Sequence, residues 1–172
     1  MATWRQGDVV CGDTFQFIHL ADLRWPTTAK ADELARELAP ESDSLEIVGV
    51  DVLGLVVLTQ TCDLVRPCTE RPYVEVCPLI ELPDNQAALV RLGRRPRFAP
   101  LPALNDDKWA ADLDRVMTVE KGLIAALTDR RERGVVSETE IRIFAEFLGM
   151  KRLRAALPDE FAVAARPMRQ RF

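Results

Sequence analysis

The segment Gly54-Leu55-Val56-Val57-Leu58-Thr59-Gln60-Thr61 decides the fold of this sequence. It opens with a continuous apolar run that contains β-branched side chains and then turns abruptly polar. A short apolar run of this kind is typical of a strand that is buried on both faces. We therefore expect this segment to be the central strand of a sheet.

Further strands are expected on both sides of this segment. Residues 73–80 follow a turn that contains prolines, and we expect them to pair antiparallel with residues 54–61. Upstream, we expect a strand at residues 45–50. Residues 7–18 are expected to form one or two short strands, with a turn at Gly12 and Asp13.

Two other segments lie between or after these strands. Residues 28–39 are rich in helix formers, have Thr27 or Thr28 as the candidate cap and end before Pro40, so they predict a surface helix inserted between strands. Residues 91–107 contain three prolines and predict irregular chain that crosses the surface.

Two helices are expected in the last third of the chain. Thr118 is a candidate cap for a helix that reaches about residue 133. Ser137 and Glu140 have the spacing of a capping box, and the helix that follows is expected to stop at Gly149.

These elements predict an α+β protein with a single domain over residues 1–172. We expect a small β-barrel over residues 1–107, with the helical insertion, and a helical part packed on it over residues 108–172.

The 172 residues are 48% hydrophobic and 29% charged, which is ordinary globular composition. No apolar run is long enough to span a bilayer, and the first residues do not resemble a secretion signal. We therefore expect a cytoplasmic protein without a membrane partner.

Charge is distributed unevenly along the chain. Residues 1–90 hold 6 basic and 15 acidic side chains, whereas residues 91–172 hold 17 and 12. An anionic partner is therefore expected at the second half. The four cysteines lack the paired C-x2-C spacing of zinc sites, so we predict neither a metal nor another cofactor.

Several segments resemble the PemK/MazF family of toxin–antitoxin ribonucleases. Residues 7–10 are similar to the family's N-terminal Gly-Asp-Val strand, and residues 56–59 and 73–79 resemble its paired central strands. Residues 114–121, Asp-Arg-Val-Met-Thr-Val-Glu-Lys, resemble a further family segment and are the most specific match. The family also places a helix soon after that segment.

The resemblance implies an SH3-like barrel with a C-terminal helix that cuts single-stranded RNA without metal. It also implies a homodimer and an antitoxin or defence-system protein as partner. In the family an arginine before the first central strand and a threonine or serine after the second carry cleavage. Here Leu53 or Gly54 and Ile80 occupy those positions, so the resemblance implies the barrel more strongly than the nuclease.

The polar end of the central strand is the leading candidate site. Thr61, Cys62, Asp63 and Arg71 are the candidate catalytic residues, with Cys62 as nucleophile or Asp63 as general base. Rigid scaffolds often present functional groups where strands end. The alternative is structural: Asp63 caps the turn and Cys62 is a small buried side chain.

The candidate RNA-binding residues are Gln60, Arg91, Arg94, Arg95 and Arg97. The alternative for these arginines is an ordinary solvated surface. Two functions follow: a PemK/MazF-like protein that binds or cleaves single-stranded RNA in a bacterial toxin–antitoxin or defence context, or a non-catalytic protein-interaction module that kept the barrel and lost nuclease activity.

Overall fold

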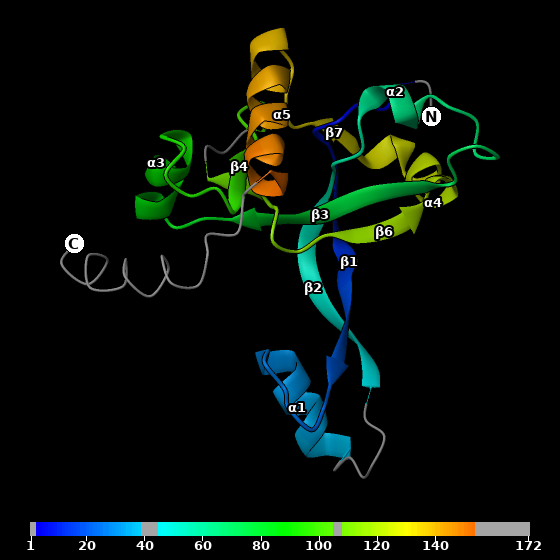
Figure 1. Ribbon diagram of the computed structural model, residues 1–172, viewed down its shortest axis with the longest axis vertical. Coiled ribbons are helices and arrows are strands. Elements are labelled where there is room, and N and C mark those ends of the chain that lie inside the picture. Colours follow the sequence, from blue (N-terminus) through cyan, green and yellow to red (C-terminus); the bar gives the residue numbers. More distant parts are fainter. Residues whose placement is uncertain (1–2, 39–44, 105–107, 154–172) are drawn as a thin grey trace.

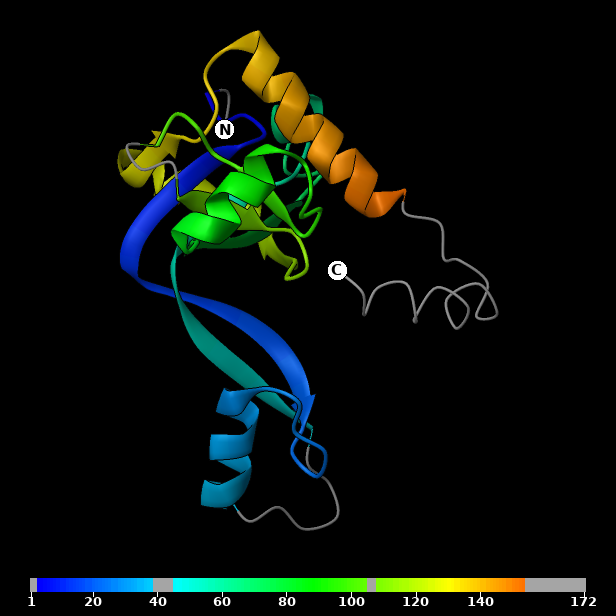
Figure 2. The same cartoon turned by 90° about the vertical axis from the view of Figure 1, so that its left-hand side faces the viewer.

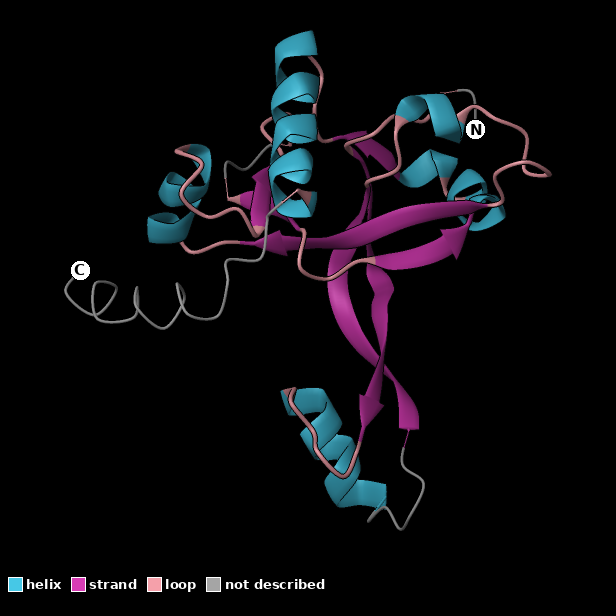
Figure 3. Cartoon of the chain, viewed as in Figure 1, coloured by secondary structure: helices cyan, strands magenta, loops and turns pink. Residues whose placement is uncertain are grey.

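The computed structural model of the protein describes residues 3–38, 45–104 and 108–153. Figure 3 shows a mixed arrangement of strands and helices, as the sequence predicts. The strands are β1 (Asp8–Asp22), β2 (Leu45–Val57), β3 (Tyr73–Glu81), β4 (Phe98–Pro100), β5 (Trp109–Asp112), β6 (Met117–Glu120) and β7 (Arg131–Arg133). The helices are α1 (Ala29–Leu38), α2 (Thr61–Leu64), α3 (Asp84–Arg91), α4 (Lys121–Ala126), the 3-10 turn η1 (Thr128–Arg130) and α5 (Glu138–Arg152).

All seven strands form one antiparallel sheet in the order β4-β5-β3-β2-β1-β7, with β6 pairing the other part of β3. The α+β class is therefore confirmed. The sheet is not closed by a continuous ladder, so the expected barrel is not confirmed. The two ends approach through a hydrogen bond from the Ala103 backbone N–H to the Gly134 carbonyl at 3.1 Å.

The apolar segment expected at the centre of the sheet is the inner half of β2. Leu55 and Val57 pack on one face with Trp4 and Ile124, whereas Val56 packs on the other face in a second cluster. Because consecutive side chains of a strand point to opposite faces, this run is apolar throughout. At Gly54 an added Cβ would lie 2.3 Å from the Val10 carbonyl oxygen, so the strand pair requires glycine there.

The outer halves of β1 and β2 leave the rest of the sheet and project as a long twisted hairpin (Figures 1 and 2). We call residues 15–38 and 45–52 the arm and the remaining described residues the body. Contrary to the expected turn at Gly12 and Asp13, β1 runs through these residues with a register shift between Cys11 and Phe15. One long strand thus replaces the one or two short strands expected.

Helix α1 is the helix expected between the strands, and it covers one face of the arm. Thr28 Oγ1 accepts a hydrogen bond from the Ala31 backbone N–H at 3.3 Å, which confirms one of the two threonines proposed as the cap. A small cluster around Leu23, Ala31 and Val48 joins the helix to the strands. The other face of the arm has no such cover among the described residues.

That outer face carries four large aliphatic side chains. Leu20 lies directly opposite Ile47 in the antiparallel register, and Ile18 and Leu45 belong to the same face. Their exposed fractions are 71% for Leu20, 68% for Ile47, 50% for Ile18 and 69% for Leu45. The arm is therefore amphipathic, with one face packed by α1 and one face apolar and open.

The expected helix from Thr118 to residue 133 is confirmed only in its middle, where it is divided into α4 and η1. Residues 117–120 form β6, in which Met117 and Val119 are half-buried while Thr118 and Glu120 are exposed. This alternation is the period of a strand, and β3 offers an edge for it. Only α4 and η1 are helical, and β7 follows them.

The expected irregular chain over residues 91–107 is interrupted by β4, which pairs with β5 at the end of the sheet, where a proline is tolerated.

The helix capped by Ser137 is confirmed. Ser137 Oγ accepts a hydrogen bond from the Glu140 backbone N–H, and the Glu140 carboxylate accepts one from the Ser137 backbone N–H. The helix does not stop at Gly149 but continues to Arg152. Residues 154–172, part of the expected helical C-terminal part, lie outside the described residues.

The expected boundary at residue 107 does not separate sheet from helices. Strands β5, β6 and β7 follow it and belong to the same sheet as β1 to β4. Among the described residues, no helix has both the length and the apolar character needed to cross a bilayer.

Candidate functional site

The candidate catalytic residues lie together in one turn after β2. Gln60 is the residue before α2, and the helix itself consists of Thr61, Cys62, Asp63 and Leu64. Leu64 is fully buried against the body core, whereas Cys62 is exposed. The turn is thus held by one apolar side chain and presents the polar ones outward.

Two arginines flank the carboxylate of this turn. Asp63 Oδ1 lies 3.5 Å from Arg66 Nε and 4.0 Å from Arg71 Nε, so the structure brings Arg71 to Asp63 as a long ion pair. Both arginine side chains are more than half exposed, and such pairs contribute little to stability. Besides Leu64, Lys121 fixes the turn, because its buried Nζ donates to the carbonyls of Asp63 and Arg66 at 2.7 and 2.9 Å.

Cys62 does not have the surroundings of an activated thiol. Its Sγ lies 3.6 Å from Gln60 Oε1, which is an acceptor and not a base that favours the thiolate. The hydroxyl of Thr61 accepts a hydrogen bond from the Gln6 backbone N–H at 3.2 Å. Because Cys62 is exposed, the alternative of a buried, structural cysteine is wrong.

The arginines proposed for RNA binding separate into two groups. Arg91 ends α3, and Arg94 and Arg95 lie in the loop before β4, where all three are exposed. Arg97 differs, because its Nε and Nη2 donate to the two carboxylate oxygens of Asp112 at 3.0 and 2.8 Å. Gln60 belongs to the α2 turn, another element of the fold.

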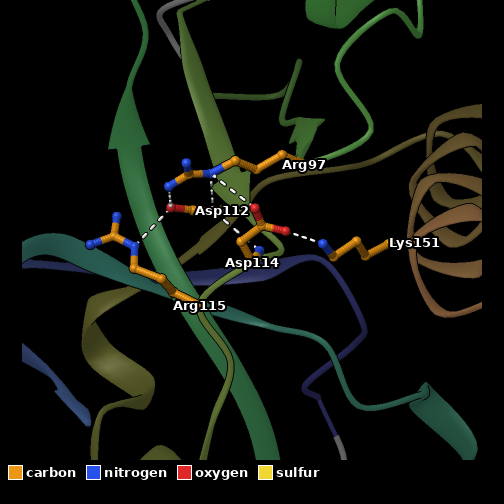
Figure 4. Close-up of polar contacts among 5 residues, drawn as sticks. All are labelled: Arg97, Asp112, Asp114, Arg115 and Lys151. Atoms are coloured by element: carbon orange, nitrogen blue, oxygen red, sulfur yellow. Dashed lines mark hydrogen bonds and ion pairs between the residues drawn. The ribbon is translucent and has the colours of Figure 1, made fainter. Parts of the chain in front are cut away.

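Arg97 is part of a charged cluster that Figure 4 shows between the end of β5 and α5. Arg115 Nε donates to Asp112 Oδ2 at 2.7 Å. Asp114 lies 3.5 Å from Arg97 Nε and forms an ion pair with Lys151 of α5. Three cations therefore surround two carboxylates, and the cluster ties α5 to the segment after β5.

Asp112 is the buried centre of this cluster. Burial by itself would raise the pKa of its carboxyl, but the hydrogen bonds from Arg97 and Arg115 outweigh that effect and hold the pKa below its usual value. Asp112 is therefore ionised at neutral pH, and its charge fixes both guanidinium groups.

Arg115 also faces a cavity between the arm and the body. The cavity measures about 640 Å³ and is lined by strand β1, the start of α1 and the residues after β5. Its lining includes Phe17, His19, Lys30, Glu33, Asp114 and Arg115. The sequence has one histidine and does not indicate its neighbours, and the folded arm brings His19 and Arg115 to the same cavity.

The remaining cysteines do not add a reactive centre. Burial, with a smaller effect of Glu132, raises the pKa of Cys11 to about 11, and burial raises that of Cys77 still further. Cys68 is exposed, like Cys62. Among the residues that the structure describes, no group of three or more His, Cys, Asp or Glu side chains is arranged to hold a metal ion.

Comparison with known proteins gives no relative for this chain. No protein family model, no curated protein and no solved structure matches it. The geometry described above therefore carries the functional inference.

Proposed function

We propose that this protein is a non-catalytic interaction module that binds a partner protein through the outer face of its arm. The observation that carries this proposal is the row of exposed aliphatic side chains at Ile18, Leu20, Leu45 and Ile47. Contiguous apolar surface of this kind marks sites of protein interaction in folded proteins.

The exposed aliphatic surface supplies part of the free energy that a stable complex needs. Removing a leucine or isoleucine side chain completely from water contributes roughly 1.5–3 kcal/mol, and four such side chains are available. Association itself costs on the order of 4–15 kcal/mol, so the apolar face requires polar contacts at its rim for stable binding. Asp51, hydrogen-bonded by Gln16, and Asp22, paired with Arg24, supply charged groups there.

The α2 turn gives less support to a catalytic function. Its thiol has an acceptor as its hydrogen-bond partner, and its carboxylate is paired with arginines. Nucleophilic catalysis needs a base that can take the proton of the nucleophile. No such base contacts Cys62 among the described residues.

The test uses the tagged full chain, expressed in the cells that naturally produce it. Leu20→Glu and Ile47→Glu place a charge on the outer face of the arm, and Leu92→Glu is the matched control at an exposed leucine of the body. We expect a stoichiometric partner to co-purify with the wild type and with Leu92→Glu and to be lost from both arm variants. Equal recovery with all four proteins would overturn the proposal.

Binding of single-stranded RNA is a second candidate function, which the exposed Arg94 and Arg95 of the α3–β4 loop favour. Phosphate contacts of this kind make affinity fall steeply with salt. The measurement is RNA binding and cleavage with and without EDTA, for the wild type and for Arg94→Ala, Arg71→Ala and Cys62→Ala. Metal-independent cleavage that Arg71→Ala or Cys62→Ala abolishes would support a ribonuclease in a toxin–antitoxin or defence context. RNA that remains intact and unbound would rule this candidate function out.

A further inference from the structure

His19 is a polar side chain whose hydrogen-bonding groups are unused. Both ring nitrogens, Nδ1 and Nε2, are shielded from solvent, and neither has a hydrogen-bond partner among the described residues. A neutral imidazole carries one donor and one acceptor, and leaving both unpaired away from water costs free energy. Because both nitrogens are shielded, His19 lines the neighbouring cavity with its ring carbons and not with its nitrogens.

The cavity beside His19 has the size of a small-molecule site. Its volume of about 640 Å³ lies within the range of roughly 300–1,000 Å³ that small-molecule sites occupy. Phe17, Ala29 and Val50 form apolar walls. The rings of Phe17 and His19 lie side by side with centroids 5.8 Å apart and planes inclined by 19°, so they present nearly parallel flat surfaces.

The acidic groups of this cavity already have cationic partners. Lys30 Nζ donates to Glu33 Oε2 at 2.7 Å, and Asp114 pairs with Arg97 and Lys151. A cationic ligand would therefore have to compete with these pairs. The cavity has no unpaired carboxylate among the described residues to attract it.

Arg115 is the cation of this cavity that has hydrogen-bond donors left for a ligand. Its Nε is used by Asp112, and its guanidinium carbon lies 5.7 Å from the centroid of the Phe17 ring. The two terminal amino groups have no hydrogen-bond partner among the residues described. A guanidinium held in this way presents a planar pair of donors, which fits an oxyanion with two oxygens in one plane.

We propose that the cavity between the arm and the body binds a small aromatic molecule that carries an oxyanion. The oxyanion accepts hydrogen bonds from the terminal amino groups of Arg115. The aromatic ring lies against the apolar walls at Phe17 and Val50. The inference is independent of the interaction through the outer face of the arm, because α1 and the cavity lie on the opposite face.

The single histidine gives a direct reporter for this site. In a spectrum that correlates Cε1 with its proton, the imidazole of His19 is the one histidine signal of the chain. The probes are 4-hydroxybenzoate and adenosine 5′-monophosphate, which carry a carboxylate and a phosphate respectively. The neutral analogues 4-hydroxybenzyl alcohol and adenosine are the matched ligand controls.

We expect at least one of the two anions to shift the His19 signal saturably, with its neutral analogue at least about tenfold weaker. Saturation by one anion and not by the other identifies whether the site takes a carboxylate or a phosphate. Val50→Phe fills the cavity without touching Asp112 and should abolish the shift. Arg115→Lys keeps a positive charge beside Asp112 but loses the planar donors, so it should weaken binding at least about tenfold, whereas Arg94→Ala should leave it unchanged.

Three results would overturn the proposal. The first is no saturable shift with either anion at millimolar concentration in the folded wild type. The second is equal binding of an anion and its neutral analogue. The third is unchanged binding in a folded Val50→Phe variant, which would place the ligand outside the cavity.

Discussion

The two halves of the β1–β2 pair show how one strand pair serves two purposes. In the body, residues 54–57 of β2 are buried on both faces and form the centre of the core. In the arm, the same strands are covered by α1 on one face and expose aliphatic side chains on the other. The body half therefore contributes stability, and the arm half contributes a surface.

The largest expected effect is that of a cavity in the body half. Leu55→Ala removes a side chain that is 2% exposed, and we expect a loss of about 2–5 kcal/mol in the free energy of unfolding. Leu53→Ala, at a neighbouring position that is half-exposed, is the control and should cost less than about 1 kcal/mol. Urea denaturation measures both, and equal losses would contradict the difference between buried and exposed positions.

The charged cluster should give the next largest effect. Asp112→Asn removes the carboxylate charge that holds Arg97 and Arg115, and we expect a loss of roughly 2 kcal/mol at pH 7. The value is moderate because Arg97 is half-exposed and solvent screens its charge. A loss near zero in urea denaturation would show that the cluster does not stabilise the body.

The same variant predicts a dependence on pH. The pKa of Asp112 is lower in the folded protein than its ordinary value of 3.8, so the ionised carboxylate is stabilised by folding. This contribution is complete above pH 3.8 and is lost as pH falls through the folded pKa. We therefore expect the stability difference between wild type and Asp112→Asn to shrink as the pH falls from neutral to below about 4. A difference that grows at acid pH would contradict the assignment.

The four cysteine thiols differ in exposure, so their rates of chemical modification test the structure without a mutation. Cys62 and Cys68 are exposed, whereas burial raises the pKa of Cys11 to about 11 and that of Cys77 still further. We expect a thiol reagent at pH 8 to modify two groups rapidly and the other two only slowly or after unfolding. Cys62→Ser should leave one rapid group, and rapid modification of all four would show that the core opens readily.

The smallest effect is expected on the outer face of the arm. Leu20→Ser changes a side chain that is 71% exposed, so the free energy of unfolding should change by less than about 0.5 kcal/mol. Val48→Ala, on the face that α1 covers, should cost more, because Val48 is buried. A large destabilisation by Leu20→Ser would indicate that this face is packed within the chain itself.

The sequence predicted correctly those helices and strands whose patterns depend only on neighbouring residues. The apolar run of β2, the strand β3 and the capping box of α5 were readable because each depends on neighbouring residues. Strand β6 was misread as helix because four residues satisfy a helical and an alternating pattern equally, and the pairing with β3 decides between them. The length of the arm was missed because the register shift in β1 resembles a turn in sequence.

The candidate sites depended even more on long-range contacts. The α2 turn was found because its polar residues are consecutive, and Arg71 was placed beside Asp63 by the loop that follows. Arg97 was proposed for RNA, although its partner Asp112 lies across the β4–β5 pair. His19 and Arg115 are far apart in sequence, and no local pattern could have placed them at the same cavity.

The most direct measurement is hydrogen–deuterium exchange of the protein with and without the partner that co-purifies with it. If the arm is the docking surface, the partner should slow exchange in residues 15–22 and 45–52 and leave the α2 turn and the α3–β4 loop unchanged. Protection confined to the α2 turn or to the α3–β4 loop, with no change in the arm, would contradict the proposed function.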